Sequence, residues 1–308
     1  MSRVDYCPDA AMDAKHRKTL PCADERLDSG LDSLKSGEYA LLAEEMESLA
    51  VDDARTDVHG LEPWKQQVTE DGDTFLHLAI IHEAKEHAIK MIQQSQGDLF
   101  LNIQNYQRQT ALHLAVITEQ PELVERLVKA GCDTRLVDRN GNTALHVACK
   151  RGSMASFAVL TQVPSAQHLR SVLSFPNYHG HNCLHLASIN GYLSMVEDLV
   201  QLGADINSKE QCSGRTALHL AVDLQNLSLV HRLISLGADV NSLTYGGFAP
   251  YHLTFGRQNS EIQQQLYEKT ARDLRLLPES ESEESDEDLP SDDEYDDIHF
   301  GGRLSPSH

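Results

Sequence analysis

The chain is poor in basic and aromatic residues and has no long apolar run. Its 308 residues include 26 Lys and Arg against 47 Asp and Glu, which gives a formal net charge of -21, and only 6% are aromatic. Such an acidic chain is poorly suited to binding DNA phosphates, and it is better suited to binding a basic partner protein. No run approaches the roughly 18 apolar residues of a membrane span, and the first residues lack the apolar core of a secretory signal. We therefore expect no membrane contact and no direct DNA binding.

Paired cysteines and catalytic motifs are missing as well. The six cysteines lie far apart without a CxxC pair: Cys7, Cys22, Cys132, Cys149, Cys183 and Cys212. This spacing disfavours a disulfide framework or a zinc site and predicts free thiols in a reducing compartment. No Ser/His/Asp set, HExxH motif, phosphate loop or GxGxxG motif is present, so we predict neither an enzyme nor a cofactor or metal.

The charge divides the chain into three regions. Residues 1–63 contain 7 basic and 15 acidic residues, residues 64–277 contain 18 and 20, and residues 278–308 contain 1 and 12. The acidic ends hold too little apolar surface to offset the entropy lost on ordering, so both are expected to be largely disordered. The near-neutral middle region is the expected folded domain.

A histidine motif recurs six times in that middle region. It reads DGDTFLHLA, QRQTALHLA, NGNTALHVA, HGHNCLHLA, SGRTALHLA and GGFAPYHLT, with 36, 33, 39, 34 and 33 residues between successive histidines. A second motif follows it, as in MVEDLVQLGADINSKE and LVHRLISLGADVNSLT. A period near 33 with T-x-LH-x-A and G-A-D-x-N resembles the ankyrin repeat. The resemblance implies an all-α solenoid of six stacked helix pairs with β-turn hairpins, over residues 70 to about 274.

Local signals agree with this arrangement. Threonines are placed to cap the first helix of several units (Thr110, Thr143, Thr216), and glycines are placed to end the second (Gly131, Gly203, Gly237). Leu123, Val124, Leu127 and Val128 form an apolar stripe on one second helix. The aligned histidines could suggest metal or general-base chemistry, but they recur once per repeat. A structural ladder that links each cap to a neighbouring loop is the preferred interpretation.

Two units depart from the pattern. The third contains VLTQVPSAQHLRSVLSF in place of a short turn, which predicts an inserted helix or loop near Pro164. The sixth lacks the second motif and begins with a group of aromatic residues, Tyr245, Phe248, Tyr251 and Phe255. These aromatics either anchor a partner or form the core of a terminal cap, and the sequence leaves both interpretations open.

The N-terminal region contains Asp28-Ser29-Gly30-Leu31-Asp32-Ser33. Phosphorylation of two serines spaced by four would create a strongly anionic patch for a partner to read. The alternative is an incidental acidic loop.

This box, the segment EPWKQQ followed by TEDGD, the stretch GRTALHLAVDLQN and an acidic tail ending in FGG together resemble the inhibitor-of-kappa-B family. The resemblance implies a cytoplasmic inhibitor that shuttles through the nucleus, binds Rel/NF-kappa-B dimers and masks their nuclear localisation segment and DNA-binding groove. It implies that the inhibitor-kappa-B kinase phosphorylates Ser29 and Ser33, and that an SCF ubiquitin ligase of the β-TrCP type then recognises the box. Lys15 and Lys18 match the ubiquitin-acceptor region, and Tyr39 matches a tyrosine phosphorylation site.

Further candidate sites follow from the same comparison. Leu42, Met46, Leu49 and Val51 have the spacing of a leucine-rich signal for a nuclear export receptor, or of a short amphipathic helix without a reader. Residues 279–299 hold 12 acids and no base and are similar to a PEST segment. Ser280, Ser285 and Ser291 each precede an acid by three residues and suit an acidophilic kinase. The tail is either a solubilising segment or an acidic surrogate for DNA phosphates.

Partner-binding residues are expected at both ends of the repeats. Asp71 and Asp73 match family acids that face the basic localisation segment, although they could serve only the first hairpin. Tyr178, Tyr245, Tyr251 and Phe255 would face the dimerisation domains of the partner. A generic ankyrin scaffold and a nuclear ankyrin coactivator of Rel proteins are the alternative functions.

Overall fold

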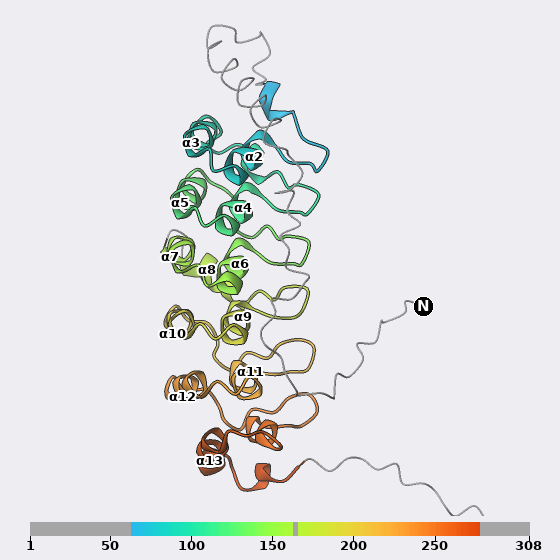
Figure 1. The fold of residues 1–308 in the computed structure, drawn as a ribbon, viewed down its shortest axis with the longest axis vertical. Coiled ribbons are helices and arrows are strands. Elements are labelled where there is room, and N and C mark those ends of the chain that lie inside the picture. Colours follow the sequence, from blue (N-terminus) through green and yellow to red (C-terminus); the bar gives the residue numbers. More distant parts are fainter. Residues whose placement is uncertain (1–62, 163–165, 278–308) are drawn as a thin grey trace, which may run out of the picture.

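The computed structural model describes residues 63–162 and 166–277, which form a stack of helix pairs. Figure 1 shows two columns of helices with the connecting loops projecting to one side. The first helices of the pairs are α2 (Phe75–Ile81), α4 (Ala111–Ile117), α6 (Ala144–Arg151), α9 (Cys183–Ile189), α11 (Ala217–Asp223) and the 3-10 helix η4 (Pro250–Thr254). The second helices are α3 (Lys85–Gln94), α5 (Pro121–Lys129), α7 (Met154–Gln162), α10 (Leu193–Gln201), α12 (Leu227–Ser235) and α13 (Ser260–Lys269). The predicted all-α solenoid of six repeats is confirmed.

Four further elements complete the described part of the chain. They are η2 (Pro63–Lys65), η3 (Leu99–Asn102), α8 (Ala166–Ser174) and η5 (Asp273–Arg275). The β-pairing seen among these residues is one isolated bridge, between Val68 and Thr74. No helix in residues 63–162 and 166–277 is long and apolar enough to cross a membrane.

The first helix of most units begins with a reciprocal cap. In α4, the Thr110 side chain accepts from the His113 backbone N–H at 3.4 Å, and the Thr110 N–H donates to His113 Nδ1 at 3.2 Å. This is a capping box in which histidine takes the place of the usual Glu or Gln. Thr143 starts α6 in the same way. The predicted caps at Thr110 and Thr143 are confirmed. Thr216 is also the N-cap residue of its helix, but the bonds described for it run to His219 Nδ1, from its backbone N–H at 3.2 Å and with its hydroxyl at 2.9 Å.

The second helices end where the glycines are placed. After α10, Gly203 has φ 96°, in the left-handed region that glycine adopts without steric cost. The apolar stripe of α5 is also present, since Leu123, Val124 and Leu127 are 0% exposed. Val128, expected in the same stripe, is only partly buried.

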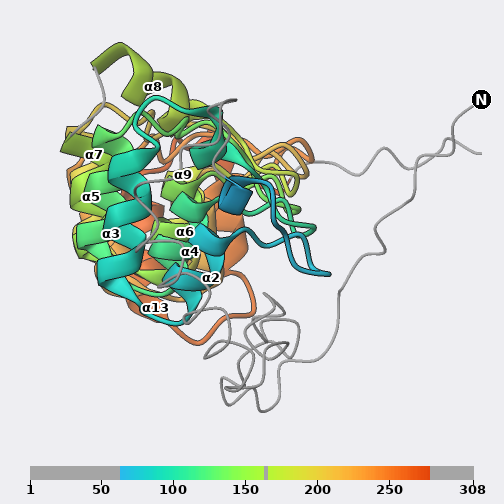
Figure 2. The same ribbon diagram turned by 90° about the horizontal axis from the view of Figure 1, so that it is seen from above.

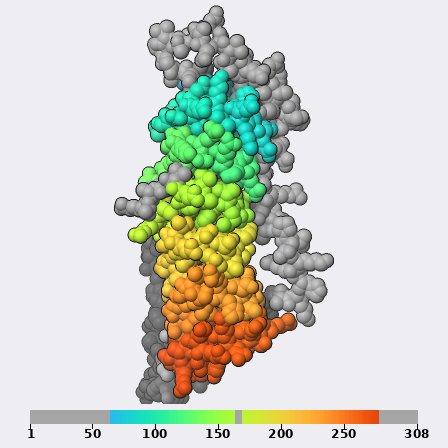
Figure 3. Space-filling model, turned by 90° about the vertical axis from the view of Figure 1, so that its left-hand side faces the viewer, coloured from blue at the N-terminus to red at the C-terminus, as the bar shows by residue number. Residues whose placement is uncertain are grey.

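The core runs through the stack without a break. The seven residues of α4 are all buried, and α4 packs on α2 before it and α6 after it. In the space-filling view of Figure 3 the sequence colours lie in consecutive bands. Each unit therefore buries its apolar face mainly against its neighbours, as a repeat solenoid does.

The two unusual units follow the sequence expectation. Helix α8 is the inserted element of the third repeat, and it projects beyond the two columns in Figure 2. In the sixth repeat the first helix is reduced to η4, and α13 ends at Thr270 with extended backbone in place of a glycine stop. The carbonyl of Leu276 accepts a hydrogen bond from His252 Nε2 at 2.8 Å. The segment after α13 thus closes the last unit.

Candidate partner-binding surface

The loops between repeats form a continuous edge, which projects from the helices in Figure 2. Backbone hydrogen bonds join neighbouring loops at their tips: Tyr106 N–H donates to the Asp71 carbonyl, Arg139 N–H to Gln107 and Tyr178 N–H to Asn140, each at 3.0 Å. Tyr245 N–H bonds the Ser213 carbonyl in the same manner at 2.9 Å. The loops are therefore held in register, and their exposed side chains present one shared surface, here called the hairpin edge.

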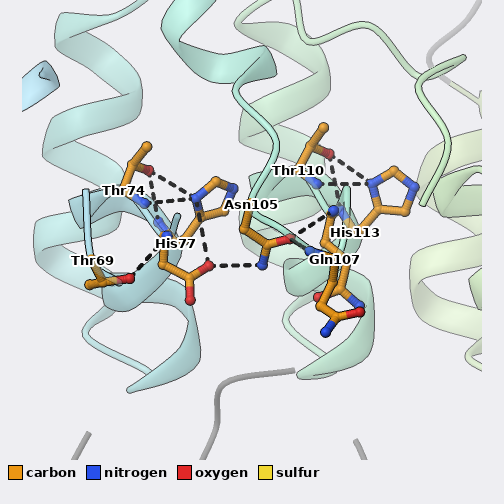
Figure 4. A network of polar contacts seen from close by, with 9 residues as sticks. Thr69, Thr74, His77, Asn105, Gln107, Thr110 and His113 are labelled. Atoms are coloured by element: carbon orange, nitrogen blue, oxygen red, sulfur yellow. Dashed lines mark hydrogen bonds and ion pairs between the residues drawn. The ribbon is translucent and has the colours of Figure 1, made fainter. Parts of the chain in front are cut away.

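The two acids predicted at the first hairpin have different environments. Figure 4 shows Asn105 of the second repeat beside the Thr74–His77 cap of the first. Asp73 is 3% exposed, and its carboxylate accepts from Asn105 Nδ2 of the next repeat at 2.8 Å. Burial raises the pKa of Asp73, the Asn105 hydrogen bond opposes this, and Asp71 adds to the rise. Asp71 itself is exposed. Asp73 thus serves the junction between the first two repeats, which favours the structural alternative for it, while Asp71 is available to a partner.

Asp73 also lies beside the first histidine of the ladder, with Oδ1 4.0 Å from His77 Nδ1. Burial, with a smaller contribution from the neighbouring His113, lowers the pKa of His77 to about 4. His77 is therefore neutral near pH 7, and the contact is polar without being an ion pair.

The other histidines of the recurring motif connect successive repeats. His113 Nε2 bonds the Asn142 carbonyl at 3.0 Å, His146 the Phe175 carbonyl at 2.9 Å and His219 the Phe248 carbonyl at 3.0 Å. Each ring thus caps its own helix with one nitrogen and holds the next loop with the other. This is the ladder that the sequence predicts.

Tyrosines on the hairpin edge cover glycines of the preceding loop. Tyr178 is 62% exposed and Tyr245 is 64% exposed. A Cβ atom built on Gly141 would lie 2.6 Å from Tyr178 Cδ1, and one on Gly214 would lie 2.7 Å from Tyr245 Cδ1. One face of each ring is therefore packed on backbone while the other atoms face solvent, as a binding anchor requires.

Arg108 is a residue of this edge that the sequence analysis missed. It has φ 58°, where the corresponding loop positions of other repeats carry glycine, as at Gly141. Its Nη1 donates to the Tyr178 hydroxyl at 3.2 Å, although the two residues are 70 positions apart. The sequence contained a signal for this, because Arg108 stands at the motif position where the other repeats have glycine.

The aromatic group of the sixth repeat is divided between core and surface. Tyr251, predicted as a partner contact, is only 8% exposed, with its ring centroid 5.1 Å from Phe255 and 5.8 Å from Tyr267. Tyr251 therefore belongs to the core of the terminal cap, and its assignment as an exposed anchor is corrected. Phe255 remains 40% exposed, so it keeps a surface that a partner can reach.

Comparison with known proteins identifies the family. The profile "Ankyrin repeats (3 copies)" matches residues 54–138 and 112–210, and the profile "Ankyrin repeat" matches residues 213–245. The chain is 56% identical to "NF-kappa-B inhibitor alpha" of Homo sapiens over 91% of its length and 90% of that protein. It is 54% identical to the Sus scrofa protein of the same name, over 97% of this chain and 96% of that one. The chain belongs to the NF-kappa-B inhibitor family of ankyrin-repeat proteins.

A solved structure of the family supports the fold. It is titled "Crystal structure of the ankyrin repeat domain of Bcl-3: a unique member of the IkappaB protein family". It has a TM-score of 0.61 and 36% sequence identity, and the match covers 65% of this chain and 87% of that one. These relatives are named as inhibitors and as an ankyrin-repeat domain, not as enzymes.

The remaining candidate sites of this NF-kappa-B inhibitor family member lie outside the described residues. They are the box serines, the acceptor lysines, the tyrosine, the export residues and the tail serines: Ser29, Ser33, Lys15, Lys18, Tyr39, Leu42, Met46, Leu49, Val51, Ser280, Ser285 and Ser291. They stay predictions from the sequence.

Proposed function

We propose that this chain inhibits Rel/NF-kappa-B transcription factors by binding their dimers and holding them in the cytoplasm. The observation that carries the proposal is its identity of 54–56% with proteins named NF-kappa-B inhibitor alpha over more than 90% of its length. The described repeats supply a rigid surface and the acidic ends supply charge. The bound dimer cannot reach the nucleus or DNA, because its localisation segment and DNA-binding groove are covered.

In this proposal different parts of the repeat stack bind different parts of the Rel dimer. The exposed Asp71, beside Glu70, faces the basic localisation segment, where opposite charge steers association. Tyr178, Tyr245 and Phe255 contact the dimerisation domains. Aromatic anchors packed on backbone lose little conformational entropy on binding, which makes them effective contacts.

Capture of Rel subunits on the immobilised full chain tests the proposal. Wild-type protein retains Rel dimers from cell extract, and Asp71→Lys weakens retention of a peptide that carries a basic localisation segment. Glu86→Lys is the matched control, because Glu86 is an exposed acid on α3, in the column away from the hairpin edge. If no Rel subunit is retained, the chain is a generic ankyrin scaffold and the proposed function is wrong.

Removal of the inhibitor is the second part of the proposal. Phosphorylation of Ser29 and Ser33 by the inhibitor-kappa-B kinase creates the site that an SCF ubiquitin ligase recognises, and ubiquitin is attached at Lys15 or Lys18. Tyr39 is an additional phosphorylation site. A nuclear export receptor binds the export signal and returns the free inhibitor to the cytoplasm; the signal consists of Leu42, Met46, Leu49 and Val51. The double variant Ser29→Ala/Ser33→Ala binds Rel dimers but persists after stimulation in an immunoblot time course. Loss at the wild-type rate would contradict this.

The acidic tail is proposed to compete with DNA. Residues 279–299 carry 12 acids and no base. Phosphorylation of Ser280, Ser285 and Ser291 would add charge there. Deletion of residues 278–308 leaves much of the Rel binding, which the repeats supply, but slows removal of Rel from labelled DNA. The defect shrinks as salt rises, since exposed charges more than about 8–10 Å apart are largely screened at physiological ionic strength. Equal removal by both proteins at low salt would leave the tail a solubility or turnover segment.

A further inference from the structure

Two arginines lie on neighbouring hairpins in the middle of the hairpin edge. Arg108 belongs to the hairpin of the second repeat and Arg139 to that of the third, and both side chains are exposed. The Arg139 N–H donates to the Gln107 carbonyl at 3.0 Å, so the two hairpins are fixed next to each other. None of the ion pairs within residues 63–162 and 166–277 involves either arginine. A chain whose net charge is -21 thus presents two positive charges that no described acid neutralises.

Exposed tyrosines accompany these arginines. Tyr106 is 73% exposed, and a Cβ atom built on Gly72 would lie 2.9 Å from its Cδ1 atom, so its ring packs on the first hairpin. Tyr178, in the hairpin of the fourth repeat, accepts the hydrogen bond from Arg108 Nη1 at 3.2 Å, which holds the arginine across the third hairpin. This single bond leaves most of the five donors of the guanidinium group available. We call Tyr106, Arg108, Arg139 and Tyr178 the middle strip.

Acidic residues occupy other hairpins of the edge. Asp71, Asp205 and Asp239 are exposed on the hairpins of the first, fifth and sixth repeats. Asp133 begins the third hairpin as Asp205 begins the fifth, but its carboxylate accepts two hydrogen bonds from Arg135, at 3.0 and 3.1 Å. The edge therefore carries acids toward both ends and arginines in its middle.

Arginines nearer to the end of the stack already contact an acid. The Asp223 carboxylate lies 3.7 Å from Arg215 Nη1 and 2.5 Å from Arg257 Nη2. Another carboxylate would have to compete with Asp223 for these two arginines. The middle strip offers its guanidinium donors without that competition.

We propose that the acidic tail, residues 279–299, docks on the middle strip of the free chain. The tail holds 12 acids and no base, whereas residues 1–63 hold 7 basic residues beside their 15 acids, so the tail is the stronger complement of the two arginines. Its carboxylates accept hydrogen bonds from Arg108 and Arg139, and such charge-assisted bonds are stronger than neutral ones. The exposed rings of Tyr106 and Tyr178 add apolar contact beside the arginines.

The tail is long enough to reach the middle strip. The described chain ends at residue 277, after the sixth repeat. Packed helices lie about 8–10 Å apart, which places the fourth hairpin about 20 Å and the second about 40 Å from the sixth. A flexible chain as long as residues 278–308 has a root-mean-square end-to-end distance of about 30 Å, and a fully extended one spans about 100 Å. Attachment to the same molecule therefore keeps the tail at a high effective concentration beside the strip.

Docking would cover a residue that the proposed function assigns to the Rel dimer. Because Tyr178 belongs to the middle strip, Rel binding at this point would displace the tail and release it toward the DNA-binding groove. This consequence rests on the proposed function, whereas the docking itself needs no Rel partner and is tested without one.

Photo-cross-linking within the full chain tests the proposal. Benzoylphenylalanine replaces Tyr295 in the tail, the protein is irradiated in dilute solution without Rel, and the cross-linked monomer is digested and mapped by mass spectrometry. Adducts in the hairpins that hold the middle strip, within residues 102–110, 134–142 and 175–182, are the expected result. Their yield should fall as the salt concentration rises, because salt screens exposed charges. Adducts confined to the sixth repeat, or spread evenly over the stack, would overturn the proposal.

Charge removal on the strip and away from it separates specific docking from general attraction. Arg108→Gln/Arg139→Gln should lower the yield of these adducts about two- to thirtyfold, because two exposed ion pairs are lost. Lys85→Gln/Lys90→Gln is the matched control, since it removes two exposed positive charges from α3, in the column away from the hairpin edge, and it should leave the yield unchanged. An equal yield from both double variants would contradict the proposal.

A second probe position decides which acidic segment occupies the strip. If benzoylphenylalanine at Tyr39 gives adducts in the three hairpins and the probe at Tyr295 gives none, the strip belongs to the N-terminal region and the proposal is wrong. Both probes lie outside the repeats, so the maps of the two labelled chains decide the question even if the arginine variants fail to fold.

Discussion

Replacement of Gly141 by alanine should destabilise the stack by two separable effects. Gly141 has φ 77°, a left-handed conformation that costs an alanine about 1–2 kcal/mol. The alanine also stiffens the unfolded chain, which offsets about 0.4–1 kcal/mol of this. Its Cβ would lie 2.6 Å from Tyr178 Cδ1 and 2.7 Å from the Tyr178 backbone nitrogen. Overpacking of this kind costs about 1–3 kcal/mol. The expected loss in the free energy of unfolding is therefore about 1–5 kcal/mol by the same principles.

Gly203 provides the matched control, because it isolates the backbone effect. Its φ is 96° and no atom lies within 4 Å of the position of a Cβ. Gly203→Ala should cost only about 1 kcal/mol. Urea unfolding followed by circular dichroism measures both variants. Tyr178→Ala should restore only part of the Gly141→Ala loss, because the contact with the backbone nitrogen remains. Equal losses for Gly141→Ala and Gly203→Ala would refute the reasoning that the tyrosine packs on the hairpin below it.

Three further predictions concern the core, the histidine ladder and the terminal cap. Leu199→Ala, at a 0% exposed position of α10, should lower the free energy of unfolding by about 2–5 kcal/mol. The same change at Leu224, which is 51% exposed, should cost less than about 0.5 kcal/mol in the same assay. Burial lowers the pKa of His219 from its ordinary value of 6.5 to about 4. Between about pH 6.5 and pH 4 the unfolded state therefore binds a proton at this histidine that the folded state does not. Stability should fall as pH falls through this window, and His219→Gln should reduce the slope by about one proton, measured by urea unfolding at several pH values. In the free protein, amide exchange should be faster at residues 245–275 than in the inner repeats, because a terminal unit has one stacking neighbour. Equal protection by mass spectrometry across all six units would contradict this.

The repeat architecture could be predicted because its signals are local. Thr110 and His113 are three residues apart and form their capping box within one helical turn. Gly203 ends its helix through its own φ angle. The inserted α8 was also expected, because the spacing between His146 and His185 is 39 residues where the other intervals are 33 to 36. Such features depend on a few neighbouring residues, so a sequence pattern contains them in full.

The environment of individual side chains was harder to predict. Asp71 and Asp73 are two residues apart and look alike in the sequence, yet one is exposed and the other is buried against Asn105, 32 residues later. Tyr251 and Phe255 likewise separate into core and surface. A sequence motif shows which residue type occupies a position, but the burial of that side chain depends on how the neighbouring repeat packs against it.

The sequence by itself determined the period, the helix starts and stops, the irregular third and sixth units and the acidic ends, since each of these depends on local chemistry or composition. Only the tertiary structure decided which distant residues meet. Stacking brings positions one repeat apart into contact, which places the Asn105 amide on the Asp73 carboxylate across 32 residues. Contact between the hairpins extends this to two repeats, which places Arg108 on the Tyr178 hydroxyl across 70 residues. The physical reason is that helix signals act within one turn, whereas these contacts depend on the register in which whole repeats pack.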